Sequence, residues 1–328
     1  ITSITDANGC TALMPSIYNV TIVVHPQPAL IFAANGTQFY EGDVIEYCEG
    51  DNIEITLDEI VAGTAPFDIE WTVNGTPDSQ TGVGLNGVLF SGTQAPGTYD
   101  LQITSITDDN GCSALDVSMY YMTIIVNPQP ALIFAANGNQ FYEGDIIEYC
   151  EGDNIEITLD EIVTGTAPFD IAWTVNGTPD SQTGVNLDDV LFSGTQSPGT
   201  YDLQITSITD DNGCSALDVS MYNAQIVVHN QPALIFAFNG SQFYEGAVFE
   251  FCENETFEVT LDEVVTGTGP FDIEWTVNGT PDSQTGVNVG DVLFSGTKPG
   301  GTYDVQITSI TDGNGCSALD VSLYYCSF

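Results

Sequence analysis

Seven of the eight cysteines recur at a fixed interval, and their thiols have the most definite chemistry in this chain. One series contains Cys10, Cys112, Cys214 and Cys316, and the other contains Cys48, Cys150 and Cys252, each with a spacing of 102 residues. Thiols repeated in this way predict a disulfide framework formed in an oxidising compartment, and free buried thiols are the alternative. Cys326 belongs to neither series, and the pattern does not explain it.

No residues with the spacing of a catalytic site accompany the cysteines. The two histidines, His25 and His229, lie beside linker residues, and Asn127 takes the equivalent position between them. A catalytic or metal-binding histidine would not alternate with asparagine among near-identical segments. The chain has no Gly-x-Ser-x-Gly motif and no zinc-ligand spacing. Carboxylates are plentiful, but a glycosidase needs two of them in one cleft. The sequence therefore predicts no catalytic residues and no enzyme.

The charge balance excludes two classes of partner. The formal net charge is -45, and Lys298 is the single basic residue apart from the two histidines. A chain without arginine and with one lysine cannot hold a phosphate backbone or an anionic membrane surface, so nucleic acid is excluded. No run of 18 apolar residues is present, which excludes direct membrane insertion. The hydrophobic fraction of 42% is sufficient for packed cores and argues against disorder.

The elements that must position the cysteines belong to a repeat. The motif Ile-Thr-Ser-Ile-Thr-Asp begins at Ile1, Ile103, Ile205 and Ile307, and Trp71, Trp173 and Trp275 keep the same interval of 102 residues. A unit of this length is a domain and not a solenoid turn. Short linkers rich in proline predict four segments: the C-terminal part of a preceding repeat (1–25), two full repeats (26–127 and 128–229) and a nearly complete one (230–328). The chain is then expected to be a window on a longer array, and a pair of unusual native termini is the alternative.

Short apolar runs between glycine, proline, asparagine and aspartate predict an all-β fold. In the first full repeat the expected strands are 29–34, 44–47, 53–60, 67–73, 88–91, 99–107 and 115–126. Seven strands in about 100 residues are typical of a β-sandwich. The stretch 32–47 is expected to form an added hairpin. The predicted fold is therefore a row of β-sandwich repeats arranged end to end.

Two motifs resemble the Ig-like class of sandwiches. Residues 69–73 (Ile-Glu-Trp-Thr-Val) resemble strand C with its core tryptophan, and 95–101 resemble the tyrosine corner of strand F. Leu101 takes the position of the second cysteine of antibody domains, and Ile55 or Leu57 is expected opposite to it. The core residues expected from this resemblance are Trp71, Trp173, Trp275, Tyr99, Tyr201 and Tyr303.

The succession Cys-Glu-Gly-Asp, Pro-Phe-Asp-Ile-Glu-Trp, Gly-Thr-Tyr and Thr-Asp-Asp-Asn-Gly-Cys resembles the Ig-like repeats of giant surface proteins of the Bacteroidota. This family includes SprB-like gliding adhesins and other cargo of the type IX secretion system. The resemblance covers every repeat. It implies a secreted, extracellular protein at a bacterial cell surface, in a family whose repeats serve as adhesins, stalks and spacers.

Ig topology indicates which cysteines lie close enough to form a disulfide. Cys48 precedes strand B and lies at the C-terminal end of its sandwich, whereas Cys112 lies in the F–G turn at the opposite end. Strands of seven residues separate these ends by more than about 20 Å, but a disulfide needs Cα atoms within about 7 Å. The expected bonds therefore join neighbouring repeats, as Cys48–Cys214 and Cys150–Cys316. Cys10, Cys112 and Cys252 would then pair with repeats outside the chain. An internal Cys48–Cys112 bond, assisted by the added hairpin, is the alternative.

The same topology places acidic residues together at the junctions. Glu49 and Asp51 are expected beside Asp210 and Asp211, and Glu151 and Asp153 beside Asp312. Calcium would relieve the repulsion between these carboxylates, although no complete calcium-binding motif is present. Solvated acidic loops are the alternative, and no other cofactor is indicated.

Two functions remain after these exclusions. The first is a structural or adhesive extracellular array, a stalk or surface filament whose partners are neighbouring repeats of the same or identical chains. The second is a multivalent array of glycan- or calcium-binding modules, in which each repeat holds one weak site for a surface glycan or an ion.

Overall fold

The computed structural model describes residues 1–14, 17 and 19–328. The chain divides into two compact units, Ile1–Pro128 and Gln129–Phe328, which are described separately. The described residues form strands and loops, and none of them lies in an α-helix. Within this part of the chain, therefore, no helix is available to cross a membrane.

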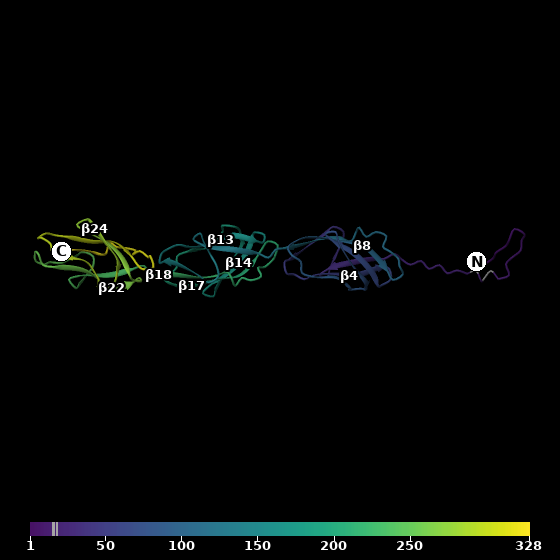
Figure 1. Ribbon diagram of the computed structural model, residues 1–328, viewed down its shortest axis with the longest axis horizontal. Coiled ribbons are helices and arrows are strands. Elements are labelled where there is room, and N and C mark those ends of the chain that lie inside the picture. The colour runs from purple at the N-terminus through teal and green to yellow at the C-terminus, as the bar shows by residue number, and fades with distance from the viewer. Residues whose placement is uncertain (15–16, 18) are drawn as a thin grey trace. The chain divides into compact units, whose positions relative to one another are not determined.

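Unit 1 contains repeat 1, a sandwich of two sheets (Figure 1). The first sheet has the order β2 (Thr37–Phe39), β1 (Ala29–Ala34), β4 (Ile53–Ala62) and β7 (Val88–Gly92). The second has the order β3 (Asp43–Cys48), β9 (Tyr121–Asn127), β8 (Gly97–Asp108), β5 (Phe67–Val73) and β6 (Thr76–Val83). All pairs are antiparallel except β3–β9, which is parallel.

Alternation of apolar and polar residues builds these strands. In β4 the inward positions Ile53, Ile55 and Leu57 are buried, and in β5 Phe67, Ile69 and Trp71 are buried, whereas the residues between them are more exposed. A strand directs successive side chains to opposite faces, so one face of each sheet supplies the core. The all-β sandwich predicted from the sequence is confirmed.

The stretch after β1 forms the added hairpin and then changes sheet. Asn35 and Gly36 have φ of 45° and 78°, the left-handed conformation that a tight turn requires, and they place Phe32 opposite Phe39. The two rings stack with centroids 6.2 Å apart. β3 then crosses to the second sheet and pairs with β9, which carries Cys48 to the end of the sandwich where β9 ends.

One predicted strand began too early, and two strands were missing from the prediction. The last strand begins at Tyr121 and not at residue 115, because the Asp116 carboxylate accepts hydrogen bonds from the backbone N–H and hydroxyl of Ser118 and holds a turn there. β2 had no strand bounds of its own in the prediction, although it lies within the hairpin expected at 32–47, and β6 was not predicted. β6 is an edge strand whose side chains are exposed except for Val83, so it has no hydrophobic alternation that a sequence pattern could show.

The core of repeat 1 contains Trp71, Leu101, Ile55 and Leu57, all buried. Tyr99 is only half-buried, which corrects the expectation of a fully buried side chain. Its hydroxyl donates to the carbonyl of Ala95 at 2.7 Å, the bond of a tyrosine corner, and the polar end of the ring must therefore remain at the surface.

Unit 2 contains repeats 2 and 3, built from the equivalent strands. The sheets of repeat 2 have the orders β11 (Asn139–Phe141), β10 (Ala131–Ala136), β13 (Ile155–Thr164), β16 (Val190–Gly194), and β12 (Asp145–Cys150), β18 (Asn223–His229), β17 (Gly199–Thr209), β14 (Phe169–Val175), β15 (Thr178–Val185). Those of repeat 3 have the orders β20 (Ser241–Phe243), β19 (Ala233–Phe238), β22 (Phe257–Thr266), β25 (Val292–Gly296), and β21 (Ala247–Val248), β27 (Tyr325–Ser327), β26 (Asp304–Thr311), β23 (Phe271–Val277), β24 (Thr280–Val287). Trp173 and Trp275 are buried in these cores, and the hydroxyls of Tyr201 and Tyr303 donate to Ser197 and Pro299.

The segment 1–25, predicted as part of a preceding repeat, contains no strand among its described residues, and Pro15, Ser16 and Tyr18 lie outside them. Its first residues nevertheless form a turn closed by an isolated bridge between Thr5 and Thr11. The same bridge occurs in every repeat, between Thr107 and Ser113, Thr209 and Ser215, and Thr311 and Ser317. The turn is therefore encoded locally.

Candidate functional site: the disulfide junction of unit 2

The first half of the junction is the end of β12 in repeat 2. Cys150 is the last residue of this strand and pairs in parallel register with His229, the last residue of β18. The carboxylate of Asp153 accepts a hydrogen bond from the backbone N–H of Cys150 at 2.8 Å, and Asp153 donates its own N–H to the Cys150 carbonyl. Cys150 is therefore held at the C-terminal end of the sandwich by both strand pairing and a turn.

The second half is the loop after β26 in repeat 3. Asp312 Oδ1 accepts hydrogen bonds from the backbone N–H groups of Asn314 and Cys316, and its Oδ2 accepts one from Thr268. One carboxylate thus fixes the loop and ties it to the neighbouring turn. Asp6 makes the same two bonds to Asn8 and Cys10, so the conformation follows from the local sequence.

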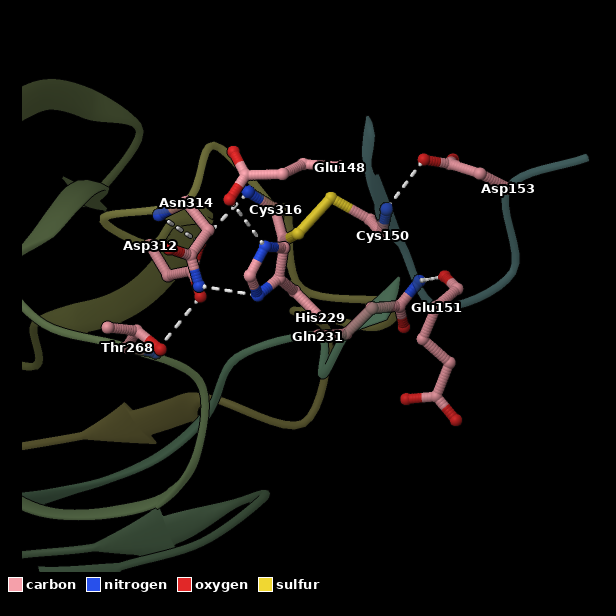
Figure 2. The surroundings of a disulfide bond; sticks show 10 residues. All are labelled: Glu148, Cys150, Glu151, Asp153, His229, Gln231, Thr268, Asp312, Asn314 and Cys316. Atoms are coloured by element: carbon pink, nitrogen blue, oxygen red, sulfur yellow. Dashed lines mark hydrogen bonds and ion pairs between the residues drawn. A yellow bond between two sulfur atoms is a disulfide. The ribbon is translucent and has the colours of Figure 1, made fainter. Parts of the chain in front are cut away.

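Cys150 and Cys316 are joined by a disulfide with a Cα–Cα distance of 5.5 Å (Figure 2). The bond connects repeat 2 to repeat 3, which is the pairing expected from the topology. Cys150 is therefore not available for an internal bond to Cys214, which would be the equivalent in repeat 2 of the Cys48–Cys112 alternative. The equivalent Cys48–Cys214 bond would join unit 1 to unit 2, and it stays a prediction.

His229 bridges the two repeats beside this disulfide (Figure 2). Its Nε2 lies 3.4 Å from Oε1 of Glu148 in repeat 2, and its Nδ1 lies 3.0 Å from the side-chain amide of Asn314 in repeat 3. The side-chain amide of Asn314 therefore faces Nδ1, and the carboxylate of Glu148 faces Nε2. Sequence reasoning assigned no role to His229. Asn127 takes the position of His229 in repeat 1, and its side-chain amide donates to Glu46, the equivalent of Glu148. The structural role of this position therefore became recognisable only from the contacts.

The linker residue Gln231 is held from both sides. Its side-chain amide donates to the carbonyl of Glu151 in repeat 2 at 2.8 Å, and its carbonyl accepts from the hydroxyl of Thr266 in repeat 3 at 2.7 Å. Pro232 packs against Gly267, where a Cβ would lie 2.8 Å from the proline Cα. The linker between these repeats is therefore attached to both sandwiches and not a free tether.

Comparisons with known proteins identify no family. No family model and no curated protein matches the chain. Among solved structures, the fibronectin(III)-like modules of Clostridium thermocellum CbhA match with 14% identity and a TM-score of 0.31, covering 61% of this chain and 94% of that chain. The FN1–FN3 domains of chicken CNTN1 match with 9% identity and a TM-score of 0.34, covering 92% and 98%. A 1.5-MDa bacterial ice-binding adhesin matches with 12% identity and a TM-score of 0.30, covering 92% and 97%. At these values the matches assign no function.

The predicted calcium cluster of Glu151, Asp153 and Asp312 does not assemble in unit 2. Asp153 and Asp312 are occupied by backbone N–H groups of their own loops, as described above. Within residues 1–14, 17 and 19–328, no group of three or more His, Cys, Asp or Glu side chains is arranged to hold a metal ion. Glu49 and Asp51 belong to unit 1 and Asp210 and Asp211 to unit 2, so that half of the calcium prediction remains a prediction.

Calcium is accordingly expected to leave the junction of unit 2 unchanged. We expect the melting temperature of unit 2 to be the same with millimolar calcium and with a chelator, because its junction carboxylates already have hydrogen-bond donors. Differential scanning calorimetry in both conditions checks this. A chelator-dependent fall, absent in Asp153→Asn, would instead establish a calcium site at this junction.

Hydrogen bonds within the turn also lower the pKa of its central aspartate. In repeat 1 the carboxylate of Asp108, the equivalent of Asp312, accepts from the backbone N–H groups of Cys112, Asn110 and Thr64. Burial raises the pKa of Asp108, but these hydrogen bonds stabilise the carboxylate more, so its pKa lies below the ordinary value. The charged form of Asp108 is therefore part of the folded turn.

We expect Asp108→Asn to destabilise repeat 1 at neutral pH and much less in acid. A pKa lowered by folding gives stability that is complete above the ordinary aspartate value of about 3.9 and is lost as the pH falls through the lowered value. Urea unfolding of both proteins at neutral pH and at about pH 2–3 measures the difference. Asp109→Asn, an exposed neighbour with the same change of charge, is the control. A difference that does not shrink in acid would contradict the assignment.

The remaining cysteines divide into two kinds. Cys10 and Cys252 are exposed and Cys112 is half-buried, and all three are free thiols. Cys326 is buried in the core of repeat 3, where repeats 1 and 2 have Met122 and Ala224. Burial, with a smaller contribution from Asp304, raises the pKa of the Cys326 thiol to about 12. Cys326 is therefore a protonated core residue and not part of the disulfide framework.

Proposed function

We propose that this chain is a segment of an extracellular structural array, a stalk or adhesive filament of a large bacterial surface protein. The observation that supports it most is the Cys150–Cys316 bond, which crosslinks one repeat to the next. The repeats carry no distinctive set of catalytic side chains. Their motifs resemble those of gliding adhesins secreted by the type IX system, and we extend the proposal to that class and to a bacterial cell surface.

The position of the bond suits a protein under tension. Cys150 and Cys316 are separated by 166 residues in sequence. When the chain is pulled from its ends, a covalent bond between these residues transmits the force directly, and the segment between them is not extended. Hydrogen bonds of His229 and Gln231 hold the same junction at low force. A stalk built in this way would lengthen little even if one sandwich opened.

Single-molecule force spectroscopy tests this proposal. In a background with Cys48→Ser and Cys214→Ser, which leaves Cys150–Cys316 as the bond under test, the segment between Cys150 and Cys316 should contribute no extension while the disulfide is intact. In a reducing agent the fully unfolded chain should lengthen by an additional 550–600 Å or so, from 166 residues at about 3.3–3.6 Å each. Cys252→Ser should behave like the unmodified chain. The same contour length in oxidising and reducing conditions would contradict the role of this bond in bearing tension.

A cavity in repeat 2 favours glycan binding as a second candidate function. It has a volume of about 220 Å³ and is lined by Trp173, Phe192 and Tyr201 together with the polar residues Asp180 and Gln196. Aromatic faces beside a carboxylate and an amide can recognise a sugar ring. A glycan array probed with and without calcium tests it. Signals that disappear in Gln196→Ala would support this candidate, and uniform absence of signal would exclude it.

A further inference from the structure

The cavity of repeat 2 opens between the edge strands of its two sheets, β15 and β16. Ile155, Leu191 and Leu203 line its inner wall and are buried. The lining residues Thr178 and Asp180 are exposed and form its mouth. The volume of about 220 Å³ is below the roughly 300–1,000 Å³ of sites that enclose a drug-sized ligand. The cavity can therefore hold one substituent of a ligand whose remainder lies at the polar mouth.

The wall of this cavity contains an unused side-chain hydrogen-bond donor. Trp173 lines the cavity and is only 4% exposed, and its indole N–H has no hydrogen-bond partner among the described residues. A buried donor without a partner opposes folding, and an acceptor on a ligand would remove that cost. The interior therefore suits a group that combines an apolar surface with a single hydrogen-bond acceptor.

Repeat 3 has a shallower pocket at the same place. Its lining includes Thr280 and Asp282, the equivalents of the two mouth residues. It does not include Leu293 or Val305, the equivalents of two residues of the inner wall in repeat 2. The mouth is therefore common to both repeats, and the inner cavity distinguishes repeat 2 from repeat 3.

A larger core side chain explains this difference. Phe257 in repeat 3 takes the position of Ile155, and its ring meets Phe294 edge-on with centroids 5.9 Å apart. Phe294 in turn stacks on Trp275, whose indole N–H is unpartnered and closed off from solvent. Among the described residues no other side-chain polar atom is both unpartnered and enclosed. The N–H of Trp173 therefore remains open to the cavity that its ring lines.

Repeat 1 has the same cavity-lining composition as repeat 2. Each of the fourteen residues that line the cavity of repeat 2 has the same residue type 102 positions earlier. Five of the equivalent positions differ in repeat 3, namely Phe257, Val259, Lys298, Val305 and Phe328. A site built from these side chains is therefore expected in repeats 1 and 2 and not in repeat 3.

We propose that this cavity, in repeats 1 and 2, binds the acetamido group of an N-acetylated sugar. The methyl group lies in the apolar interior, and the carbonyl oxygen accepts a hydrogen bond from the tryptophan indole N–H. The pyranose ring lies at the mouth, where Thr178, Asp180 and Gln196 offer polar groups to its hydroxyls. A hydroxyl group in the interior would lose hydrogen bonds to water without replacing them, so an unsubstituted hexose fits less well. This inference rests on glycan binding, the second candidate function, and names its ligand class.

The tryptophans, one in each repeat, allow the site to be observed by nuclear magnetic resonance. In the isotope-labelled full chain each indole N–H gives one signal, which is assigned by replacing each tryptophan with phenylalanine in turn. N-acetylglucosamine should shift the signals of Trp71 and Trp173 and leave that of Trp275 unchanged. The methyl group and the hydrogen bond together should make its binding roughly 10- to 30-fold tighter than that of glucose.

A closed form of repeat 2 can be made with the residues of repeat 3. Ile155→Phe, Ile157→Val and Leu203→Val together introduce the three core residues that repeat 3 has at these positions, and they keep the core volume nearly constant. In this variant the Trp173 signal should no longer respond to N-acetylglucosamine, whereas the Trp71 signal should respond as before. Urea unfolding checks that the variant retains its fold.

Leu217→Ala, at an exposed position of repeat 2, is the control and should keep both responses. Equal binding of glucose and N-acetylglucosamine would overturn the acetamido assignment and leave the glycan candidate standing. No response of Trp71 and Trp173 to either sugar would overturn both, and an equal response of Trp275 would overturn the placement in the inner cavity. If the closed variant does not fold, the contrast between Trp173 and Trp275 in the unmodified chain decides. The force test of the structural array is independent of every one of these results, because it involves no sugar.

Discussion

Replacing Cys150 and Cys316 by serine is expected to lower the free energy of unfolding of unit 2 by up to roughly 5 kcal/mol. In the chain-entropy model a disulfide restricts the unfolded state, and the restriction grows with the length of the closed loop. The separation of 166 residues makes this loop long. The hydrogen bonds of His229 and Gln231 would remain, so the repeats stay adjacent while the crosslink is lost.

Calorimetry of the double variant and of the unmodified chain measures this effect. The two sandwiches of unit 2 have separate cores, so the transition is analysed for each repeat and not as one two-state step. Cys252→Ser is the matched control, because it removes an exposed free thiol at the same position in repeat 3. Equal melting of the double variant and the control would show that the bond adds nothing to stability.

How far the sequence predicts this structure depends on whether a feature is periodic. Strands with one buried face, such as β4 and β5, follow from alternation alone. The Cys150–Cys316 pairing follows from the direction of the strands, because Cys150 ends β12 and Cys316 lies in the loop that faces it. Both features needed only the order of the elements and the spacing of the cysteines.

The features that could not be predicted depend on particular side-chain contacts. β6 is exposed on both faces except at Val83 and is held by its ladder with β5, which leaves no hydrophobic alternation. The calcium prediction for unit 2 counted carboxylates but not the backbone N–H groups that occupy Asp153 and Asp312. His229 was set aside because asparagine replaces it in repeat 1, yet both side chains contact the equivalent glutamate. Interchangeable residues can therefore perform one structural role.

The tryptophan of repeat 3 is expected to show how packing and hydrogen bonding contribute separately to the core. Trp275 is buried, and its ring stacks on Phe294 with centroids 5.7 Å apart. Its indole N–H is a buried side-chain donor without a hydrogen-bond partner among the described residues. The side chain therefore stabilises repeat 3 through its apolar area, while its polar atom opposes folding.

Trp275→Ala should destabilise repeat 3 by about 3–5 kcal/mol, because it leaves a large cavity in the core. Trp275→Phe should cost much less. It retains an aromatic ring, and removal of the unpartnered donor recovers part of a desolvation penalty of about 1–3 kcal/mol. Urea unfolding of the two variants measures both effects, with Leu319→Ala, an exposed position in the same repeat, as the control. If Trp275→Phe were as destabilising as Trp275→Ala, the indole N–H would have a partner in solution, such as an ordered water molecule, and the core would depend on that bond as well as on packing.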